Sequence, residues 1–242
     1  MLKNFTATAA IAIGLIGLAA CSSGPRQSVP DRIINRALAS APGQAQPGDV
    51  VATELAFARL AREKGQWTAF AEYAADSGVM FVPQPVNARQ WLKGRANPAE
   101  AVRWQPHQVW MSCDGSLAVT KGAWQRPDGS QGYFTTVWER QKDRSYKWVL
   151  DQGDILTEPL AEPEFIQTAV ADCRAGQAIA AGVNTPLDSR PAYGSGASQD
   201  GSLSYEWDVA ADLSRRLRIS MIKDGKTVDA LQLEVAPPPP GA

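Results

Sequence analysis

The chain has 242 residues, with 24 lysines and arginines against 25 aspartates and glutamates, one histidine and three cysteines. This near balance of charge is not that of a nucleic-acid-binding protein or a basic membrane-surface protein, so we expect no nucleic-acid partner. A single histidine excludes a His-rich metal site, and the chain has neither a glycine-rich phosphate loop nor a metal-spaced cluster. We therefore expect no metal and no other cofactor.

The first 21 residues have the pattern of a bacterial export signal that ends in an acylation site. A run of apolar and small residues, 5–20, follows a single positive charge and is too short for a membrane-spanning helix. The sequence Leu18-Ala19-Ala20-Cys21 resembles the bacterial lipobox, which implies cleavage before Cys21 and acylation of its thiol. The alternative is an ordinary cleavable signal with a chance cysteine. We predict a signal peptide over 1–20 and a lipid-anchored protein that faces the periplasm, at the outer membrane because Ser22 follows the cysteine.

Composition divides the exported chain into four parts. Residues 21–48 are small, polar and proline-containing, which indicates a tether. Residues 49–157 are predicted to form an α+β domain, and 158–236 a C-terminal helix and β-meander appendage. Residues 237–242 form a proline-rich tail.

The spacing of apolar residues changes from helical to alternating along the predicted domain. After Asp49, a plausible N-cap, Val51, Leu55 and Ala58 form the apolar row of a first helix, and a second helix covers 67–75. A β-like run at 79–83 and a short helix at 96–102 come next. Alternating residues then predict four antiparallel strands, at 103–113, 116–126, 131–141 and 145–153, and three further strands, at 203–211, 215–223 and 227–235.

Turn lengths fix which side chains share a face of the predicted sheet. With two-residue turns at Asp114-Gly115 and Asp128-Gly129, one face carries a row that packs on the two helices: Trp110, Val119, Trp138 and Trp148. The opposite face is too apolar to be left bare. We expect a helix over 161–176 to cover it.

Two cysteines remain once the lipidated one is set aside. An even pair in an oxidising compartment favours a disulfide between Cys113 and Cys173, which the helix over 161–176 would bring together. Two buried free thiols are the alternative.

Two stretches carry a family resemblance: "ELAFARLAREKGQWTAFAEYAADSGVMFVP" and "GSLAVTKGAWQRPDGSQGYFTTVWERQKDRSYKWVLDQGD". In their order of helices, strands and polar turns they resemble the nuclear transport factor 2-like superfamily, its SnoaL-like and DUF4440-type branches, over residues 49–155. The resemblance implies an α+β fold in which a curved antiparallel sheet is wrapped by N-terminal helices into a cone with a pocket. A helix and a small three-stranded β appendage would follow.

Some members of that superfamily are isomerases, cyclases or dehydratases that use an aspartate, or an aspartate with a histidine, in the pocket. Candidate catalytic residues here are Asp76, His107 and Asp151, the last close to Asp154. Ordinary roles remain open for each of them: a turn, a structural histidine and a solvated strand end. Candidate ligand-binding residues are Tyr73, Trp110, Lys121, Trp138 and Trp148, although the tryptophans fit a core equally well.

Three functions follow from these observations. The first is a non-catalytic lipoprotein whose pocket binds a small apolar ligand or an envelope protein. The second is a small-molecule isomerase or lyase that uses Asp76, Asp151 or His107. The third is an envelope scaffold or a homodimer. The sequence shows no convergent set of catalytic groups, so we expect the first.

Overall fold

The computed structural model describes residues 44–173, 182, 184–189 and 191–239. The predicted signal peptide, Cys21 and most of the predicted tether lie outside the described residues. Within the described ranges, no helix is both long enough and apolar enough to cross a membrane.

In the described part of the chain, three helices precede or interrupt the first strands. They are α2 (Pro47–Lys64), α3 (Gln66–Tyr73) and α4 (Ala88–Leu92). Helix α2 buries one of its faces, which includes Val50, Glu54 and Phe57, whereas Leu55 is 46% exposed. The predicted apolar row of this helix is therefore wrong in part, because a glutamate occupies a buried position. The short helix predicted at 96–102 is absent; residues 97–98 have no regular structure.

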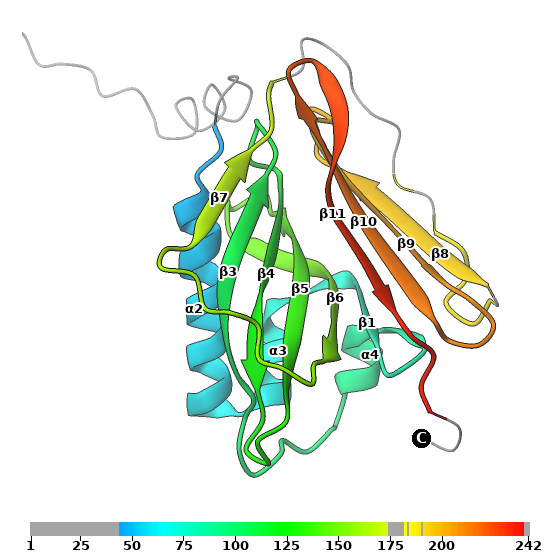
Figure 1. Ribbon diagram of the computed structural model, residues 1–242. Helices are drawn as coiled ribbons and strands as arrows, with labels where there is room; N and C mark the ends of the chain where they lie inside the picture. The colour runs from blue at the N-terminus through cyan, green and yellow to red at the C-terminus, as the bar shows by residue number, and fades with distance from the viewer. Residues whose placement is uncertain (1–43, 174–181, 183, 190, 240–242) are drawn as a thin grey trace, which may run out of the picture.

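The helices pack on one face of a seven-stranded mixed sheet (Figure 1). Its strand order is β2-β1-β6-β5-β4-β3-β7. The four central strands match the predicted meander to within two residues. The bounds are β1 Ala74–Phe81, β2 Pro85–Asn87, β3 Arg103–Met111, β4 Leu117–Gln125, β5 Gln131–Arg140, β6 Tyr146–Ile155 and β7 Gln167–Val170.

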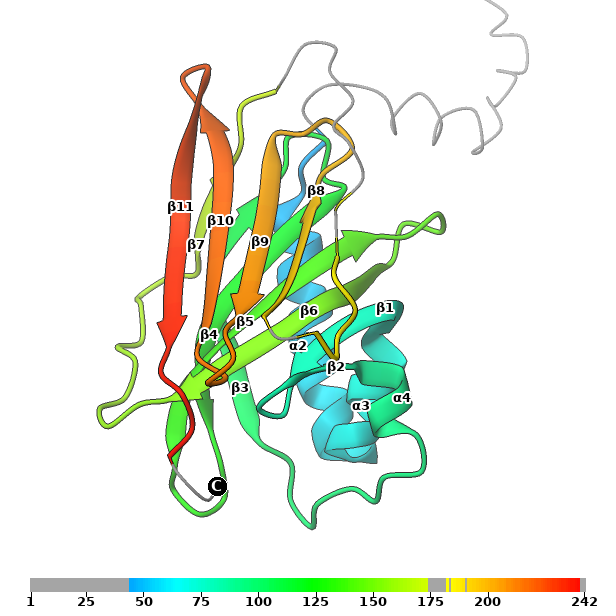
Figure 2. The same cartoon turned by 90° about the vertical axis from the view of Figure 1, so that its right-hand side faces the viewer.

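A second, four-stranded antiparallel sheet covers the other face of the large sheet (Figures 1 and 2). Its strands are β8 Ala192–Ala197, β9 Leu203–Val209, β10 Arg215–Lys223 and β11 Lys226–Val235, in the order β11-β10-β9-β8. Four strands are present rather than the three predicted, because 192–197 pairs with β9. The apolar layer between the sheets includes Trp110, Val119, Leu203 and Ile219.

The helix predicted over 161–176 is wrong for the described residues 161–173. Residues 167–170 form the edge strand β7, parallel to β3, with Val109 opposite Thr168. This pairing occupies the backbone groups at the open edge of β3, which a helix would leave free. The apolar face is therefore covered by the second sheet and not by a helix.

The predicted register holds on both sides of the second turn and fails across it. Trp110 pairs with Val119 and Trp138 with Trp148, as expected, but Val119 pairs with Val137 instead of Trp138. The turn after β4 has a three-residue loop, closed by a hydrogen bond from Arg126 N to Ser130 O, where two residues had been assumed. One extra residue reverses the faces of the following strand, so Trp138 and Trp148 face the helices while Trp110 and Val119 face the second sheet.

Cys113 and Cys173 form a disulfide, as predicted, with their Cα atoms 5.0 Å apart. The bond ties the end of β3 to the segment that follows β7. It closes a 60-residue separation, and in the chain-entropy model a loop of this size stabilises a fold by about 4 kcal/mol.

A repeated hexapeptide joins the two sheets next to this disulfide. Ser112–Leu117 and Ser198–Leu203 share the pattern S-x-D-G-S-L, and both form the turn of a hairpin. In each turn the aspartate accepts hydrogen bonds from both serine hydroxyls. Across the pair, Asp114 N donates to Asp200 Oδ2 at 3.1 Å and Asp200 N donates to Asp114 Oδ2 at 3.0 Å. We call this reciprocal contact between the two hexapeptides the turn clasp.

The turn clasp contributes to stability beyond its two separate turns. We expect Asp200→Ala to lower the free energy of unfolding by about 2–3 kcal/mol in urea titrations, because buried partners lose their acceptor. Asp212→Ala is the control, since Asp212 accepts hydrogen bonds from the N–H and the hydroxyl of one serine, Ser214, in an exposed turn; it should cost under about 1 kcal/mol. Equal losses would show that the reciprocal contacts add nothing.

Candidate functional site

A cavity of about 700 Å³ lies on the helix-facing side of the large sheet. Side chains from α2, α3, β1, β3, β4, β5 and β6 line it, and most are aromatic or aliphatic. Three carboxyl groups also belong to its lining. The aromatic residues of the wall are Phe57, Trp67, Phe70, Phe81, Trp104, Trp124 and Phe134; the carboxyl groups on the inner wall are Glu54 and Asp151, and Asp154 lies at the end of β6.

Glu54 is a fully buried carboxyl group contributed by helix α2. Trp104 Nε1 donates to Oε1 at 2.8 Å, and Thr120 Oγ1 donates to Oε2 at 2.6 Å. Trp138 Nε1 lies 3.2 Å from Oε2 and 3.0 Å from Thr120 Oγ1. The donors come from β3, β4 and β5, so one side chain connects the helix to three neighbouring strands.

Asp151 projects from β6 into the same cavity and is half-buried. Thr136 of β5, its cross-strand partner, donates a hydrogen bond from Oγ1 to Oδ1 at 2.8 Å. Thr136 also connects to the Glu54 cluster, because its backbone oxygen lies 3.5 Å from Thr120 Oγ1. Glu54 and Asp151 are therefore connected through Thr120 and Thr136, and these four polar residues lie together within an otherwise apolar wall.

Burial raises the pKa of both carboxyl groups to about 7. For Glu54 the loss of water dominates, and the hydrogen bonds from Thr120, Trp104 and Trp138 oppose it. For Asp151 burial again dominates, the Thr136 hydrogen bond lowers the pKa, and the charge of Glu54 raises it. A carboxyl group with a pKa near neutrality can both accept and return a proton at physiological pH, which is the property of a general acid–base.

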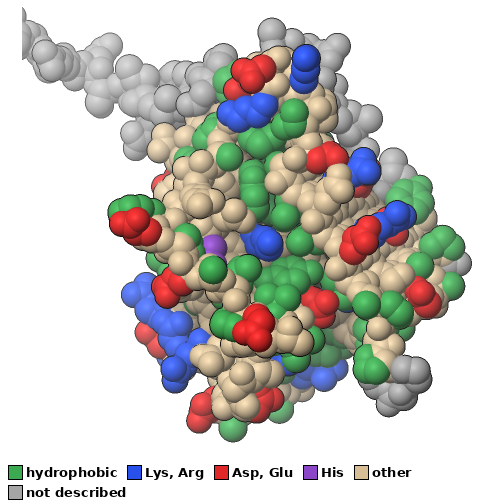
Figure 3. Space-filling model, in the orientation of Figure 1, with side chains coloured by type: hydrophobic (Ala, Val, Ile, Leu, Met, Phe, Trp, Pro, Cys, Tyr) green, Lys and Arg blue, Asp and Glu red, His purple; other side chains and the backbone are tan. Residues whose placement is uncertain are grey.

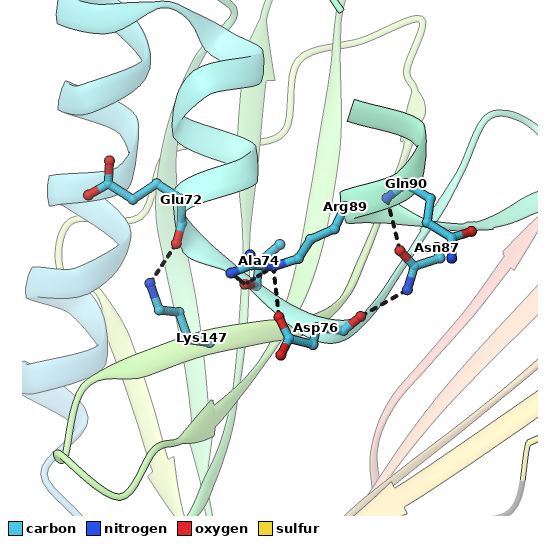
Figure 4. A network of polar contacts seen from close by, with 7 residues as sticks. All are labelled: Glu72, Ala74, Asp76, Asn87, Arg89, Gln90 and Lys147. Atoms are coloured by element: carbon cyan, nitrogen blue, oxygen red, sulfur yellow. Dashed lines mark hydrogen bonds and ion pairs between the residues drawn. The ribbon is translucent and has the colours of Figure 1, made fainter. Parts of the chain in front are cut away.

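Asp76, a second sequence candidate, lies outside this cavity (Figure 4). Its side chain is 96% exposed and forms an ion pair with Arg89 at 3.1 Å. Its backbone oxygen accepts a hydrogen bond from Asn87, which also caps α4 (Figure 4). These contacts give Asp76 a role in joining β1 to α4.

His107, Lys121 and Trp110 are not among the residues that line the cavity. His107 is buried at the irregularity of β3 between Pro106 and Gln108, and burial lowers its pKa. Lys121 has a pKa lowered by burial, and its ammonium lies 5.5 Å from the ring centre of Tyr133. Trp110 packs between the two sheets.

The remaining candidates, Tyr73, Trp138 and Trp148, pack in the core beneath the helices. Phe57 contacts the rings of Tyr73 and Trp138 at 5.0 and 6.0 Å between centroids. Trp138 also reaches a carboxyl group of the site, because its Nε1 lies 3.2 Å from Glu54 Oε2. Sequence reasoning missed Glu54 itself, yet a signal was present: an acid interrupts the helical row Val50, Phe57, Ala61.

Within the described ranges, no group of three or more histidine, cysteine, aspartate or glutamate side chains could hold a metal ion.

No family model and no curated protein matches the chain. Among solved structures, a "putative ketosteroid isomerase" from Parabacteroides distasonis is 16% identical and has a TM-score of 0.36; the match covers 43% of this chain and 85% of that one. A "putative aromatic ring hydroxylase" from Novosphingobium aromaticivorans is 15% identical with the same TM-score; 48% and 95% are covered. At such identities and scores, neither similarity assigns an activity to this chain.

The raised pKa of Glu54 makes stability depend on pH. Unfolded Glu54 loses its proton near pH 4.5 and folded Glu54 near 7, so the folded state holds more protons between these values. The free energy of unfolding should therefore fall by about 3 kcal/mol from this group as pH rises from 4.5 to 7, and then level off. Urea titrations of Glu54→Gln should lose the part of the slope that Glu54 contributes and keep the part from Asp151, whereas the exposed control Glu63→Gln should keep the whole slope. An unchanged slope in Glu54→Gln would contradict the assignment.

Proposed function

We propose that the cavity binds a small, largely apolar molecule and that Asp151 moves a proton on it, as in an isomerase or a lyase. The observation that carries the proposal is a carboxyl group with a pKa of about 7 on the wall of a 700 Å³ aromatic cavity. Cavities of this size bind molecules of a few rings. Our expectation of binding without chemistry is revised on this point.

Asp151 and Glu54 have different roles in this proposal. Asp151 lines the cavity and is partly accessible, so as a carboxylate it can take a proton from the ligand and return it to another atom. Thr136 holds one of its oxygens and leaves the other available. Glu54 has no exposed surface and acts as a positioning residue: its charge raises the pKa of Asp151. The low polarity of the cavity wall strengthens this electrostatic effect of Glu54 on Asp151.

We also propose that the domain belongs to the nuclear transport factor 2-like superfamily. Support comes from the residue pattern over 49–155 together with a mixed α+β architecture in which helices and a large curved sheet enclose a pocket. The four-stranded second sheet is an addition to that plan.

We further propose that Cys21 carries a covalently attached lipid anchor and that the protein faces the periplasm. The Cys113–Cys173 disulfide supports an oxidising compartment. The lipobox-like sequence Leu18–Cys21 supports attachment to a membrane.

Asp151→Asn tests the proton-transfer step. The probe is 5-nitrobenzisoxazole, an apolar molecule that opens to a cyanophenolate when a base removes its ring proton and the N–O bond breaks. With residues 22–242, which include every described residue, we expect saturable catalysis that rises with pH through a midpoint near 7 as Asp151 ionises. Asp151→Asn should lower the rate about 100-fold or more.

The exposed Asp76→Asn is the matched control and should leave the rate unchanged. Glu54→Gln should move the midpoint below that of the native chain, since a like charge is removed. If the probe binds saturably but Asp151→Asn reacts as fast as the native chain, the cavity binds ligands and Asp151 has no catalytic role.

Intact-mass spectrometry of the full chain expressed in a bacterium tests the anchor. We expect loss of residues 1–20 and the added mass of a diacylglyceryl group with fatty acids, all on Cys21. Cys21→Ser should accumulate with its signal peptide uncleaved, because the acylated cysteine is the substrate of the peptidase. A measured mass that includes no acyl group on Cys21 would contradict the proposal.

A further inference from the structure

Three arginines stand at one end of the cavity. Arg126, just after β4, lines the cavity itself. Arg62 near the end of α2 and Arg103 at the start of β3 line an adjoining hollow of about 650 Å³. Trp104 and Trp124 are shared by both spaces, so the arginines and the aromatic cavity meet at these two rings. Figure 3 shows blue side chains gathered at the lower left, over the end of α2.

None of these three arginines forms an ion pair with a residue in the described part of the chain. The guanidinium of Arg126 lies 4.5 Å from the ring centre of Trp124, and Nη1 is 3.4 Å from Ser130 Oγ. Stacking on the indole holds this cation at the cavity without a neutralising carboxylate. The hydrogen-bonding capacity of the group remains available to a ligand.

The nearby carboxylates form no ion pair with these three arginines within the described residues. Asp154 interacts with Arg215, which is held against the cavity wall by hydrogen bonds to Gln152 and Gly153. Glu100 lines a small depression with Arg103 and Arg126. Asp128, in the exposed turn, interacts with Arg126 and is bonded to Ser130. Glu162 accepts a hydrogen bond from Gln105, which lines the same hollow as Arg62 and Arg103. Carboxylates therefore lie near the three guanidinium groups, but none of them is bound to one, so a ligand can bind there.

We infer that the ligand is an amphipathic anion: an apolar ring system fills the cavity, and a carboxylate, phosphate or sulfonate group binds Arg126 and Arg103 at its rim. The inference rests on the proposed function and names the class of molecule that Asp151 would act on. Guanidinium groups recognise such oxyanions through paired hydrogen bonds. The anionic group stays at the rim, away from Glu54, while the rings reach Asp151.

A matched pair of fluorescent probes tests the inference. The anion 8-anilinonaphthalene-1-sulfonate and the neutral N-phenyl-1-naphthylamine differ only in the sulfonate. With residues 22–242 we expect the anion to bind about tenfold more tightly, the effect of one charge-assisted contact. The double variant Arg103→Gln/Arg126→Gln should weaken binding of the anion about tenfold more than binding of the neutral probe, and so remove this preference.

Two controls separate the possible outcomes. Arg218→Gln removes an arginine that is paired with Glu206 on the second sheet, so it should change neither affinity. Val102→Trp places a large ring in the cavity wall and should weaken both probes. If both probes bind equally, and the arginine substitutions change nothing while Val102→Trp weakens both, the anion inference is overturned and the pocket stands. If neither probe binds, or if Val102→Trp has no effect on either, the proposed pocket itself fails.

Discussion

The buried carboxyl group of Glu54 is the constraint on which this arrangement depends. Removing a carboxyl group from water is unfavourable unless donors replace the lost hydration. Trp104, Thr120 and Trp138 supply those donors from three adjacent strands, so the side chain fixes how α2 lies on the sheet. It also fixes the plane of the Trp104 indole, which forms part of the cavity wall. An apolar residue at this position would fill the space but leave the indole N–H of Trp104 without its acceptor.

The same carboxyl group has an electrostatic consequence across the cavity. Two ionised carboxylates in one apolar wall repel each other, so each favours the protonated form of the other. Asp151 is the more accessible of the two and therefore the one whose proton a ligand can receive. The second sheet supports this wall from behind: its apolar layer packs on the reverse of β3 to β6, and the turn clasp and disulfide hold it in place. The cavity is thus built on a sheet that is packed on both faces.

Much of the fold was accessible from the sequence because alternation and turn residues are local signals. The bounds of the central strands were predicted to within two residues. The Cys113–Cys173 disulfide was predicted as well. The faces were not, because a three-residue loop around Asp128-Gly129 has the same residues as a two-residue turn and differs only in hydrogen bonding. Residues 167–170 were mistaken for helix because four residues of an edge strand carry too little periodicity to decide.

The site was harder to predict than the fold. Asp151 was among the candidates, but its pKa is raised mainly by burial and to a smaller extent by the charge of Glu54, and both arise only in the tertiary structure. Glu54 could have been noticed as the acid on an apolar helix face. The hexapeptide repeat could also have been noticed, since Ser112–Leu117 and Ser198–Leu203 match at four defined positions besides the leading serine. Its meaning required the reciprocal hydrogen bonds of the folded chain.

The most direct test is a ¹³C NMR titration of the side-chain carboxyl carbons in protein labelled at aspartate and glutamate, with Asp151→Asn and Glu54→Gln used to assign the signals. The account predicts two carboxyl signals with apparent midpoints near 7, which shift when either partner is substituted because the two titrations are coupled. If every carboxyl group titrated below about pH 5, as free aspartate and glutamate do, the site would hold no proton-transfer group at neutral pH.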